Sequence, residues 1–86
     1  MAKIEIYSTQ ICGFCFAAKR LLKSKNAKFT EFDINKHPEK RNEMLSRANG
    51  KRTVPQIFIA GLHIGGCDEL YNLEHGGKLD GLLGKT

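Results

Sequence analysis

The order of apolar segments and turn residues predicts an α/β fold in which helices cover both faces of a four-stranded mixed sheet. Two observations carry this prediction. An alternating run at residues 4–7 leads into two cysteines and then into a stretch with helical spacing. Farther along, apolar runs at 56–59 and 62–65 are separated by Ala60-Gly61, which indicates a β-hairpin. The predicted order is βαβ, then α, then ββα.

The first part of the chain contains two predicted strands with a helix between them. Residues 2–7 are expected to form a strand because Ile4 and Ile6 alternate with charged residues. Residues 13–25 are expected to form a helix with an apolar inner face. The residues on that face are Cys15, Ala18, Leu21 and Leu22. Residues 28–34 form the second predicted strand, although their apolar residues do not alternate cleanly, and the two strands should pair in parallel.

The second part adds a helix, the hairpin and a last helix. Pro38 suits the first turn of a helix, where its missing N–H is not needed, and this helix should end at 49–50. After the hairpin, a helix is expected to start at 67–69 and to end at the glycines 76–77. A short turn at 79–83 should pack the end of the chain onto the core.

Cys12 and Cys15 carry the clearest chemical signal. Residues at i and i+3 share one face of a helix, so the two thiols lie within bridging reach if Cys12 stands at the helix start. The unpaired N–H groups and partial positive charge at that end stabilise a thiolate, which is the nucleophilic form. The pattern therefore predicts a redox-active dithiol with Cys12 as the nucleophile.

Two other interpretations of these cysteines stay open at this point. A Cys-x-x-Cys pair is also half of a zinc site, and a free cysteine can simply fill a core. A structural zinc site usually needs a second pair of ligands at short spacing. The remaining candidate ligands are Cys67, His37, His63 and His75, and no two of them have that spacing.

Length and composition predict one globular domain, 1–86, with 41% hydrophobic and 27% charged residues. No apolar run approaches the roughly 18 residues of a membrane span, and no export signal is evident, so we expect a cytoplasmic protein without membrane contact. In a reducing cytosol a cysteine pair is more commonly catalytic than structural. The net charge of +5 suits solubility or attraction of small anions. Basic residues are not interleaved with aromatics, so no nucleic acid partner is expected.

Two further motifs accompany the cysteines, Thr-Val-Pro-Gln-Ile-Phe-Ile at 53–59 and Ile-Gly-Gly-Cys-Asp at 64–68. With these motifs in this order, the chain resembles the glutaredoxins, most closely the small bacterial dithiol members with a thioredoxin-like fold. The resemblance implies a monomeric, glutathione-dependent thiol–disulfide oxidoreductase that needs no metal. It would reduce glutathione mixed disulfides and protein disulfides, with glutathione as reducing co-substrate and with glutathionylated or disulfide-bonded proteins as partners.

The resemblance also implies site residues. Cys12 matches the catalytic nucleophile and Cys15 the resolving thiol. The residues that match the glutathione site of the family are Phe14, Thr53, Val54, Pro55, Gly66, Cys67 and Asp68. Of these, Phe14 matches an aromatic side chain beside the bound tripeptide. The backbone of Thr53 and Val54 matches the segment that pairs with the cysteine of glutathione.

Pro55 matches a cis-proline that faces the thiols. Residues 66–68 match the loop and helix start that hold the γ-glutamyl carboxylate, and a glycine-rich approach to a helix N-terminus suits an anion. Taken alone, the same segment also fits an ordinary turn and N-cap. Cys67 is expected to be an inert helix-start residue, with a regulatory thiol as the alternative.

Two departures from the family pattern leave alternatives open. Gly13-Phe14 stands where dithiol members usually have Pro-Tyr. Gly-Phe is typical of monothiol members, which often hold a [2Fe–2S] cluster between two subunits with glutathione as co-ligand, so a cluster carrier is the alternative function. Thr9 replaces a usual lysine, and the candidate cations for the glycine carboxylate of glutathione are Arg41, Lys51 and Arg52. A thioredoxin-like reductase that does not use glutathione is disfavoured by 65–68.

Overall fold

The computed structural model describes residues 2–84, so residues 1, 85 and 86 of the predicted domain lie outside the described part. Its elements, in chain order, are β1 (Ile4–Ser8), α1 (Gly13–Ser24), β2 (Thr30–Asp33), α2 (Pro38–Arg47), β3 (Gln56–Ile59), β4 (Leu62–Gly65), α3 (Cys67–His75) and α4 (Leu79–Leu82). The strands form one sheet in the order β2-β1-β3-β4. Strand β1 is parallel to β2 and antiparallel to β3, and β4 is antiparallel to β3. The predicted mixed sheet is confirmed.

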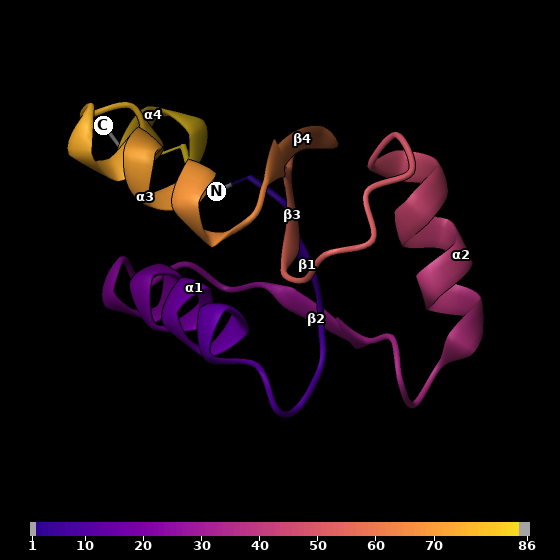
Figure 1. Ribbon diagram of the computed structural model, residues 1–86. Helices are drawn as coiled ribbons and strands as arrows, with labels where there is room; N and C mark the ends of the chain where they lie inside the picture. The colour runs from indigo at the N-terminus through magenta and orange to yellow at the C-terminus, as the bar shows by residue number, and fades with distance from the viewer. Residues whose placement is uncertain (1, 85–86) are drawn as a thin grey trace.

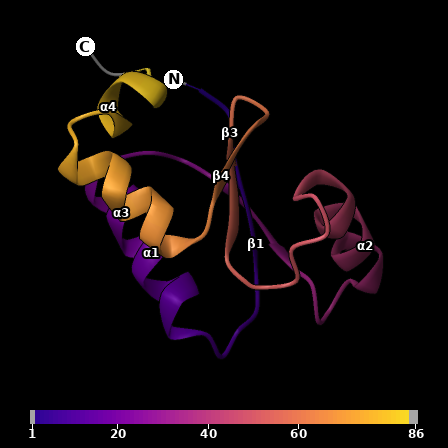
Figure 2. The ribbon, with the colours of Figure 1, turned by 45° about the horizontal axis from the view of Figure 1, so that its top comes forward.

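Helices cover both faces of this sheet, as predicted. Helices α1, α3 and α4 lie on one side and α2 lies on the other (Figure 1), and the view turned by 45° shows the same separation (Figure 2). Strand residues therefore pack alternately into two cores. The larger core joins Ile6 and Ile57 of the sheet to Leu22 of α1 and Leu70 of α3. The smaller core lies beneath α2.

The second strand is shorter than the predicted 28–34: it spans Thr30–Asp33, lies at the edge of the sheet and pairs with β1. Phe29, just before β2, packs into the larger core, whereas Phe32 and Ile34 belong to the smaller one. Side chains three positions apart in an extended chain point to opposite faces. The irregular apolar pattern of this segment therefore reflects a strand with helices over both of its faces.

The two ends of the described chain meet on the side of α4. Strand β1 begins at Ile4 rather than at the predicted residue 2, because the N–H of Ala2 donates to the carbonyl of Leu83 across 3.2 Å. Leu79 and Leu83 are fully buried. The predicted terminal turn is confirmed, and it packs onto the core that also supports α1 and α3. Within residues 2–84, no helix is long and apolar enough to cross a membrane.

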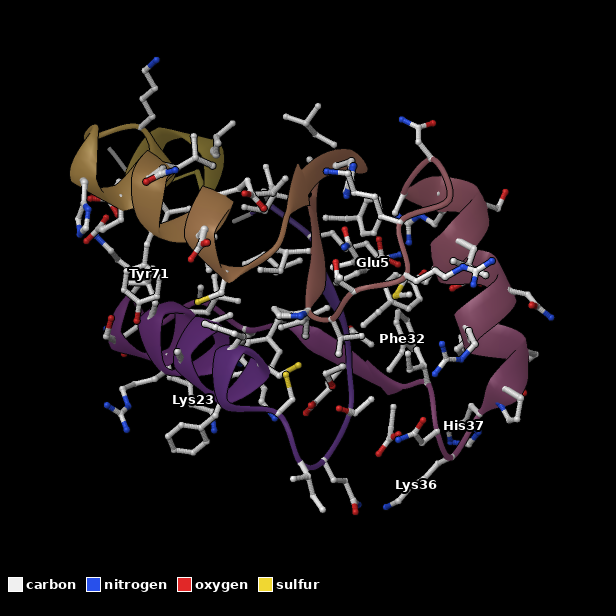
Figure 3. The ribbon with its side chains drawn as sticks, viewed as in Figure 1. Glu5, Lys23, Phe32, Lys36, His37 and Tyr71 are labelled. Carbon is white, nitrogen blue, oxygen red and sulfur yellow. The ribbon has the colours of Figure 1, made fainter. Side chains whose placement is uncertain are left out.

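Polar contacts fix the helices to their neighbours. Arg47 of α2 donates to the hydroxyl of Tyr7 at 2.8 Å and to Glu5 at 2.9 Å, and Tyr7 donates to Glu43. Burial, with the hydrogen bond to Glu43, raises the pKa of Tyr7 to about 12. On the other face Tyr71 of α3 reaches across to α1 (Figure 3), where its hydroxyl donates to a main-chain carbonyl at 3.2 Å. The contacts of Arg47 and Glu43 hold α2 against β1, and the contact of Tyr71 holds α3 against α1.

Candidate active site

Cys12 is the N-cap of α1, in the extended conformation that this position requires (φ −154°, ψ 107°). Its sulfur accepts a hydrogen bond from the N–H of Cys15 at 3.2 Å. This contact gives a partner to one of the N–H groups that the first helical turn leaves unpaired. The thiol also lies 3.8 Å from the carbonyl oxygen of Val54, to which it donates. Cys12 is half-buried, so its sulfur faces both solvent and the loop before β3.

Cys15 has the opposite environment, although it lies only one helical turn away. It is 1% exposed and packs on the inner face of α1. Burial, followed by its hydrogen bond with Cys12, raises the pKa of the Cys15 thiol to about 12. Both cysteines are free thiols in this structure. A substrate can therefore reach the sulfur of Cys12, whereas the thiol of Cys15 is buried beneath it and stays protonated at neutral pH.

The loop before β3 lies against the start of α1. Its Val54–Pro55 peptide bond is cis, which confirms the expectation from the family resemblance. The carbonyl oxygen of Pro55 lies only 3.4 Å from the point where a Cβ would stand at Gly66. The start of α3 therefore lies next to this loop, at a distance that is an ordinary van der Waals contact.

One cavity of about 260 Å³ lies where α1, the loop before β3 and the start of α3 meet. It is lined by Phe14, Thr53, Val54, Pro55, Gly66, Cys67, Asp68 and Glu69. The structure therefore brings together around a single hollow all seven residues that the sequence predicts for glutathione, from three separate segments. Phe14 is 66% exposed and forms one wall. The loop that contacts Cys12 forms another.

Glu69 is the lining residue that the sequence analysis missed. Its carboxylate reaches back to accept a hydrogen bond from the N–H of Gly66, the N-cap of α3, at 2.6 Å. A glutamate three positions after an N-cap is the signal that identifies this contact. Gly65 makes room for it, because its φ is +113° and a Cβ there would lie 2.7 Å from the Glu69 carboxylate.

The sequences of known proteins are similar to this one over nearly its whole length. The glutaredoxin family model matches residues 4–64. A probable glutaredoxin from Synechocystis sp. is 55% identical over 82 residues, which cover 95% of this chain and 93% of the relative. Glutaredoxin 3 of Escherichia coli K12 is 52% identical over 83 residues, covering 96% of this chain and 99% of the relative.

The chain belongs to the glutaredoxin family.

Solved structures agree with this assignment. A buckwheat glutaredoxin–glutathione complex matches with a TM-score of 0.87 and 30% identity, covering 96% of this chain and 77% of that one. The solution structure of a glutaredoxin from Brucella melitensis matches with a TM-score of 0.83 and 50% identity, covering 100% and 95%. The fold is thioredoxin-like, as predicted. This glutaredoxin is a glutathione-dependent thiol–disulfide oxidoreductase, and the comparisons do not favour the cluster-carrier alternative over that activity.

Cys67 of this glutaredoxin lies at the cavity but is poorly placed to react. It is 8% exposed and contributes to the larger core. Burial, followed by the negative charge of Asp68, raises the pKa of the Cys67 thiol. A buried, protonated thiol is a weak nucleophile. These properties agree with the expectation that Cys67 is an inert helix-start residue.

The cation that would hold the glycine carboxylate of glutathione is not among the cavity residues. The three candidates, Arg41, Lys51 and Arg52, are exposed. Within the described part of the chain, the lining of the 260 Å³ cavity includes no basic residue. Thr9 lines a separate hollow beside Ile11. For residues 2–84, no three His, Cys, Asp or Glu side chains form a group that could hold a metal ion.

Proposed function

We propose that this glutaredoxin acts through Cys12 as nucleophile and Cys15 as resolving thiol, and binds glutathione in the 260 Å³ cavity. The observation that carries the proposal is the position of this cavity. The Val54 carbonyl that contacts the Cys12 sulfur belongs to a residue that lines it. A tripeptide seated there would have its own sulfur beside Cys12.

For a glutathione mixed disulfide, the Cys12 thiolate attacks the glutathionyl sulfur. A Cys12–glutathione disulfide forms, the substrate sulfur leaves as a thiolate, and that thiolate takes a proton from solvent. The thiolate of a second glutathione then attacks the glutathionyl sulfur on Cys12. This step releases oxidised glutathione and restores the Cys12 thiolate. Cys15 takes no part in this route, which agrees with its burial and its high pKa.

For a protein disulfide, the Cys12 thiolate attacks one sulfur and releases the other as a thiolate, leaving a Cys12–substrate disulfide. Cys15 then loses its proton and attacks the sulfur of Cys12. The second substrate thiol leaves, and a Cys12–Cys15 disulfide remains, which two glutathione molecules reduce. The contact between the Cys15 N–H and the Cys12 sulfur supports this step, because the two residues already lie within one helical turn.

The cavity walls support separate contacts for the cysteine and γ-glutamyl parts of glutathione. Thr53 and Val54 offer backbone groups on one side, and Phe14 offers an aromatic surface. At the start of α3, Glu69 already occupies the N–H of Gly66. The N–H groups of Cys67 and Asp68 are therefore the donors proposed to hold the γ-glutamyl carboxylate, where the helix dipole favours an anion. Of the predicted residues 66–68, the proposal therefore assigns the carboxylate to Cys67 and Asp68, and not to Gly66.

We further propose that residues 1–86 act as one domain, as a monomer in the cytoplasm, on glutathionylated or disulfide-bonded proteins. Three free thiols suit a reducing compartment. Ile11 is 99% exposed directly before Cys12, and Phe14 is exposed directly after Gly13. Exposed apolar side chains of this kind often mark a protein contact, so a protein substrate would meet them as its disulfide approaches Cys12.

A glutathione-ligated [2Fe–2S] carrier is the second candidate, because Gly13-Phe14 stands between the cysteines. In the described residues one chain offers only Cys12 as an accessible thiol, and no metal-binding group of three. Two chains and two glutathiones would be needed to supply four thiolates. Anaerobic reconstitution with iron, sulfide and glutathione separates the candidates: a coloured dimer supports the carrier, and a colourless monomer excludes it.

The binding proposal is tested by following backbone amide signals of the isotope-labelled protein by NMR as S-methylglutathione is added. Signals of residues 53–54 and 67–68 are expected to move together. A larger cavity of about 500 Å³ lies between β4, α3 and α4 and offers an internal control. If the signals that move belong to Leu62, Asn72 and Lys78 of that cavity instead, the proposed glutathione site is wrong.

A further inference from the structure

Gln56, the first residue of β3, is an unusual core residue. It is 1% exposed, and among residues 2–84 it shares with Ser8 the property of being a buried polar side chain. An amide removed from water is destabilising unless its hydrogen bonds are made within the protein. The partners of Gln56 therefore indicate what this amide does in the fold.

The amide of Gln56 uses both of its ends. Its Nε2 donates to the carbonyl oxygen of Thr53 at 2.9 Å and to the Thr53 hydroxyl at 3.1 Å. Its Oε1 lies 2.7 Å from Nε2 of His63 in β4. A carbonyl oxygen only accepts, so Nε2 of His63 carries the hydrogen. The contact therefore persists whether His63 is neutral or charged.

The ring of His63 packs against an aromatic side chain of β3. It stacks on Phe58 at 5.0 Å between ring centres with an interplanar angle of 27°. His63 of β4 thus donates to Gln56 from a ring that packs on Phe58, and Gln56 in turn donates to Thr53. This chain of contacts runs from β4 to the loop that lines the cavity and contacts Cys12.

We propose that Gln56 and His63 are a positioning pair for the Thr53–Val54 backbone, and that they set the affinity for glutathione without touching it. The proposal rests on the glutathione site proposed above. The cis-proline loop between Thr53 and Gln56 has no regular secondary structure of its own, so its shape depends on such contacts. Without the Gln56 amide bonds, Thr53 loses two hydrogen bonds and the loop samples other conformations.

Two variants of one residue separate this role from simple packing. His63→Phe keeps an aromatic ring over Phe58 but removes the donor. His63→Gln removes the ring, but its Nε2 can donate from nearly the same place. We expect His63→Phe to raise KM for a glutathionylated peptide by about fivefold with kcat within about twofold, because bound-state positioning is lost and the thiols are untouched. His63→Gln should keep KM near that of the wild type.

Gln56→Met is the second test, since it fills the same volume without hydrogen bonds. Its KM should rise as in His63→Phe, and the double variant should be no worse than Gln56→Met, because residues that act as one unit are not additive. An unchanged KM in His63→Phe overturns the proposal. So do equal losses in His63→Phe and His63→Gln, since these would indicate packing. Thermal unfolding of each variant verifies that it is folded.

Amide signals of Thr53 and Val54 distinguish failure of this inference from failure of the glutathione site. If S-methylglutathione moves neither signal in the wild type, the proposed site itself is wrong. If both signals move, and the His63→Phe variant titrates at the same ligand concentration as the wild type, the site stands and the positioning role is wrong. The expected result is movement in both proteins, with a weaker affinity in His63→Phe.

Discussion

The backbone N–H of Cys15 donates to the sulfur of Cys12 across 3.2 Å, within the first turn of α1. This one relationship gives the two thiols different chemistry. The same helix turn that supplies a donor to the half-buried sulfur of Cys12 places the sulfur of Cys15 inside the core, where burial raises its pKa to about 12. Cys12 and Cys15 are the same residue type, so their different reactivities follow from their positions along α1.

This difference predicts selective alkylation. At neutral pH, iodoacetamide should modify Cys12 and leave Cys15 and Cys67 unmodified, because both of the latter are buried and have raised pKa values. Peptide mass spectrometry after a short exposure measures this directly. All three should react in the unfolded protein, which is the control. Modification of Cys67 as fast as that of Cys12 would contradict the inert role given to Cys67.

The pKa of Cys15 also predicts how stability changes with pH. The unfolded thiol titrates near 9 and the folded one near 12, so between these values the folded protein keeps a proton that the unfolded chain has lost. This contribution to stability is complete below 9 and decreases as pH rises toward 12, by up to about 1.4 kcal/mol per pH unit.

Urea unfolding of the wild type and of Cys15→Ser at several alkaline pH values measures the effect. Tyr7, whose pKa is also raised to about 12, is present in both proteins, so the difference between them isolates Cys15. The free energy of unfolding should fall more steeply with pH in the wild type. Parallel slopes would show that Cys15 is less shielded than the structure indicates.

Gly65 is predicted to tolerate no side chain. Gly65→Ala forces a residue with a Cβ into a φ of +113° and places that carbon 2.7 Å from the Glu69 carboxylate that caps α3. Gly61→Ala is the matched control, because Gly61 also has a positive φ but has no atom within 4 Å of its added Cβ. Backbone strain of this kind costs about 1–3 kcal/mol. Gly65→Ala should be the more destabilised in urea unfolding, and equal losses would remove any role for the Glu69 contact.

Asp68 and Cys67 should contribute unequally to glutathione affinity. Cys67→Ser keeps the backbone N–H that is proposed to hold the γ-glutamyl carboxylate, so the Michaelis constant for glutathione should stay near that of the wild type. Asp68→Ala removes a carboxylate that can pair with the amino group of the tripeptide, and should raise this constant by about tenfold. A greater loss in Cys67→Ser than in Asp68→Ala would place the γ-glutamyl contacts elsewhere.

Local sequence signals were sufficient for much of the fold and site. Helix and hairpin boundaries depend on residues a few positions apart, such as Pro38 at the start of α2 and Ala60-Gly61 between β3 and β4, and these were predicted correctly. The strand at 28–34 was predicted too long, because residues packed in the two cores extend beyond the segment that pairs with β1. Through their resemblance to the glutaredoxins, the Thr-Val-Pro and Gly-Gly-Cys-Asp motifs identified six residues that share one cavity, and the Cys-Gly-Phe-Cys motif added Phe14.

Contacts between distant segments were not predictable in this way. Two examples are the contacts of Arg47 with Tyr7 and Glu5 and the contact of Gln56 with His63. These residues lie on different elements, which come together only in the completed sheet. In the sequence each is an ordinary polar residue. Only the structure shows that Gln56 is buried and that both its amide nitrogen and its amide oxygen have hydrogen-bond partners.

The central claim is that Cys12 alone carries reduction of glutathione mixed disulfides. The most direct test is the glutathione-coupled assay on a glutathionylated peptide, with the wild type, Cys12→Ser and Cys15→Ser measured side by side. Cys12→Ser should lose activity by at least about a thousandfold, as expected for removal of a nucleophile. Cys15→Ser should retain most of it. Substantial activity in Cys12→Ser, or its loss in Cys15→Ser, would contradict the account.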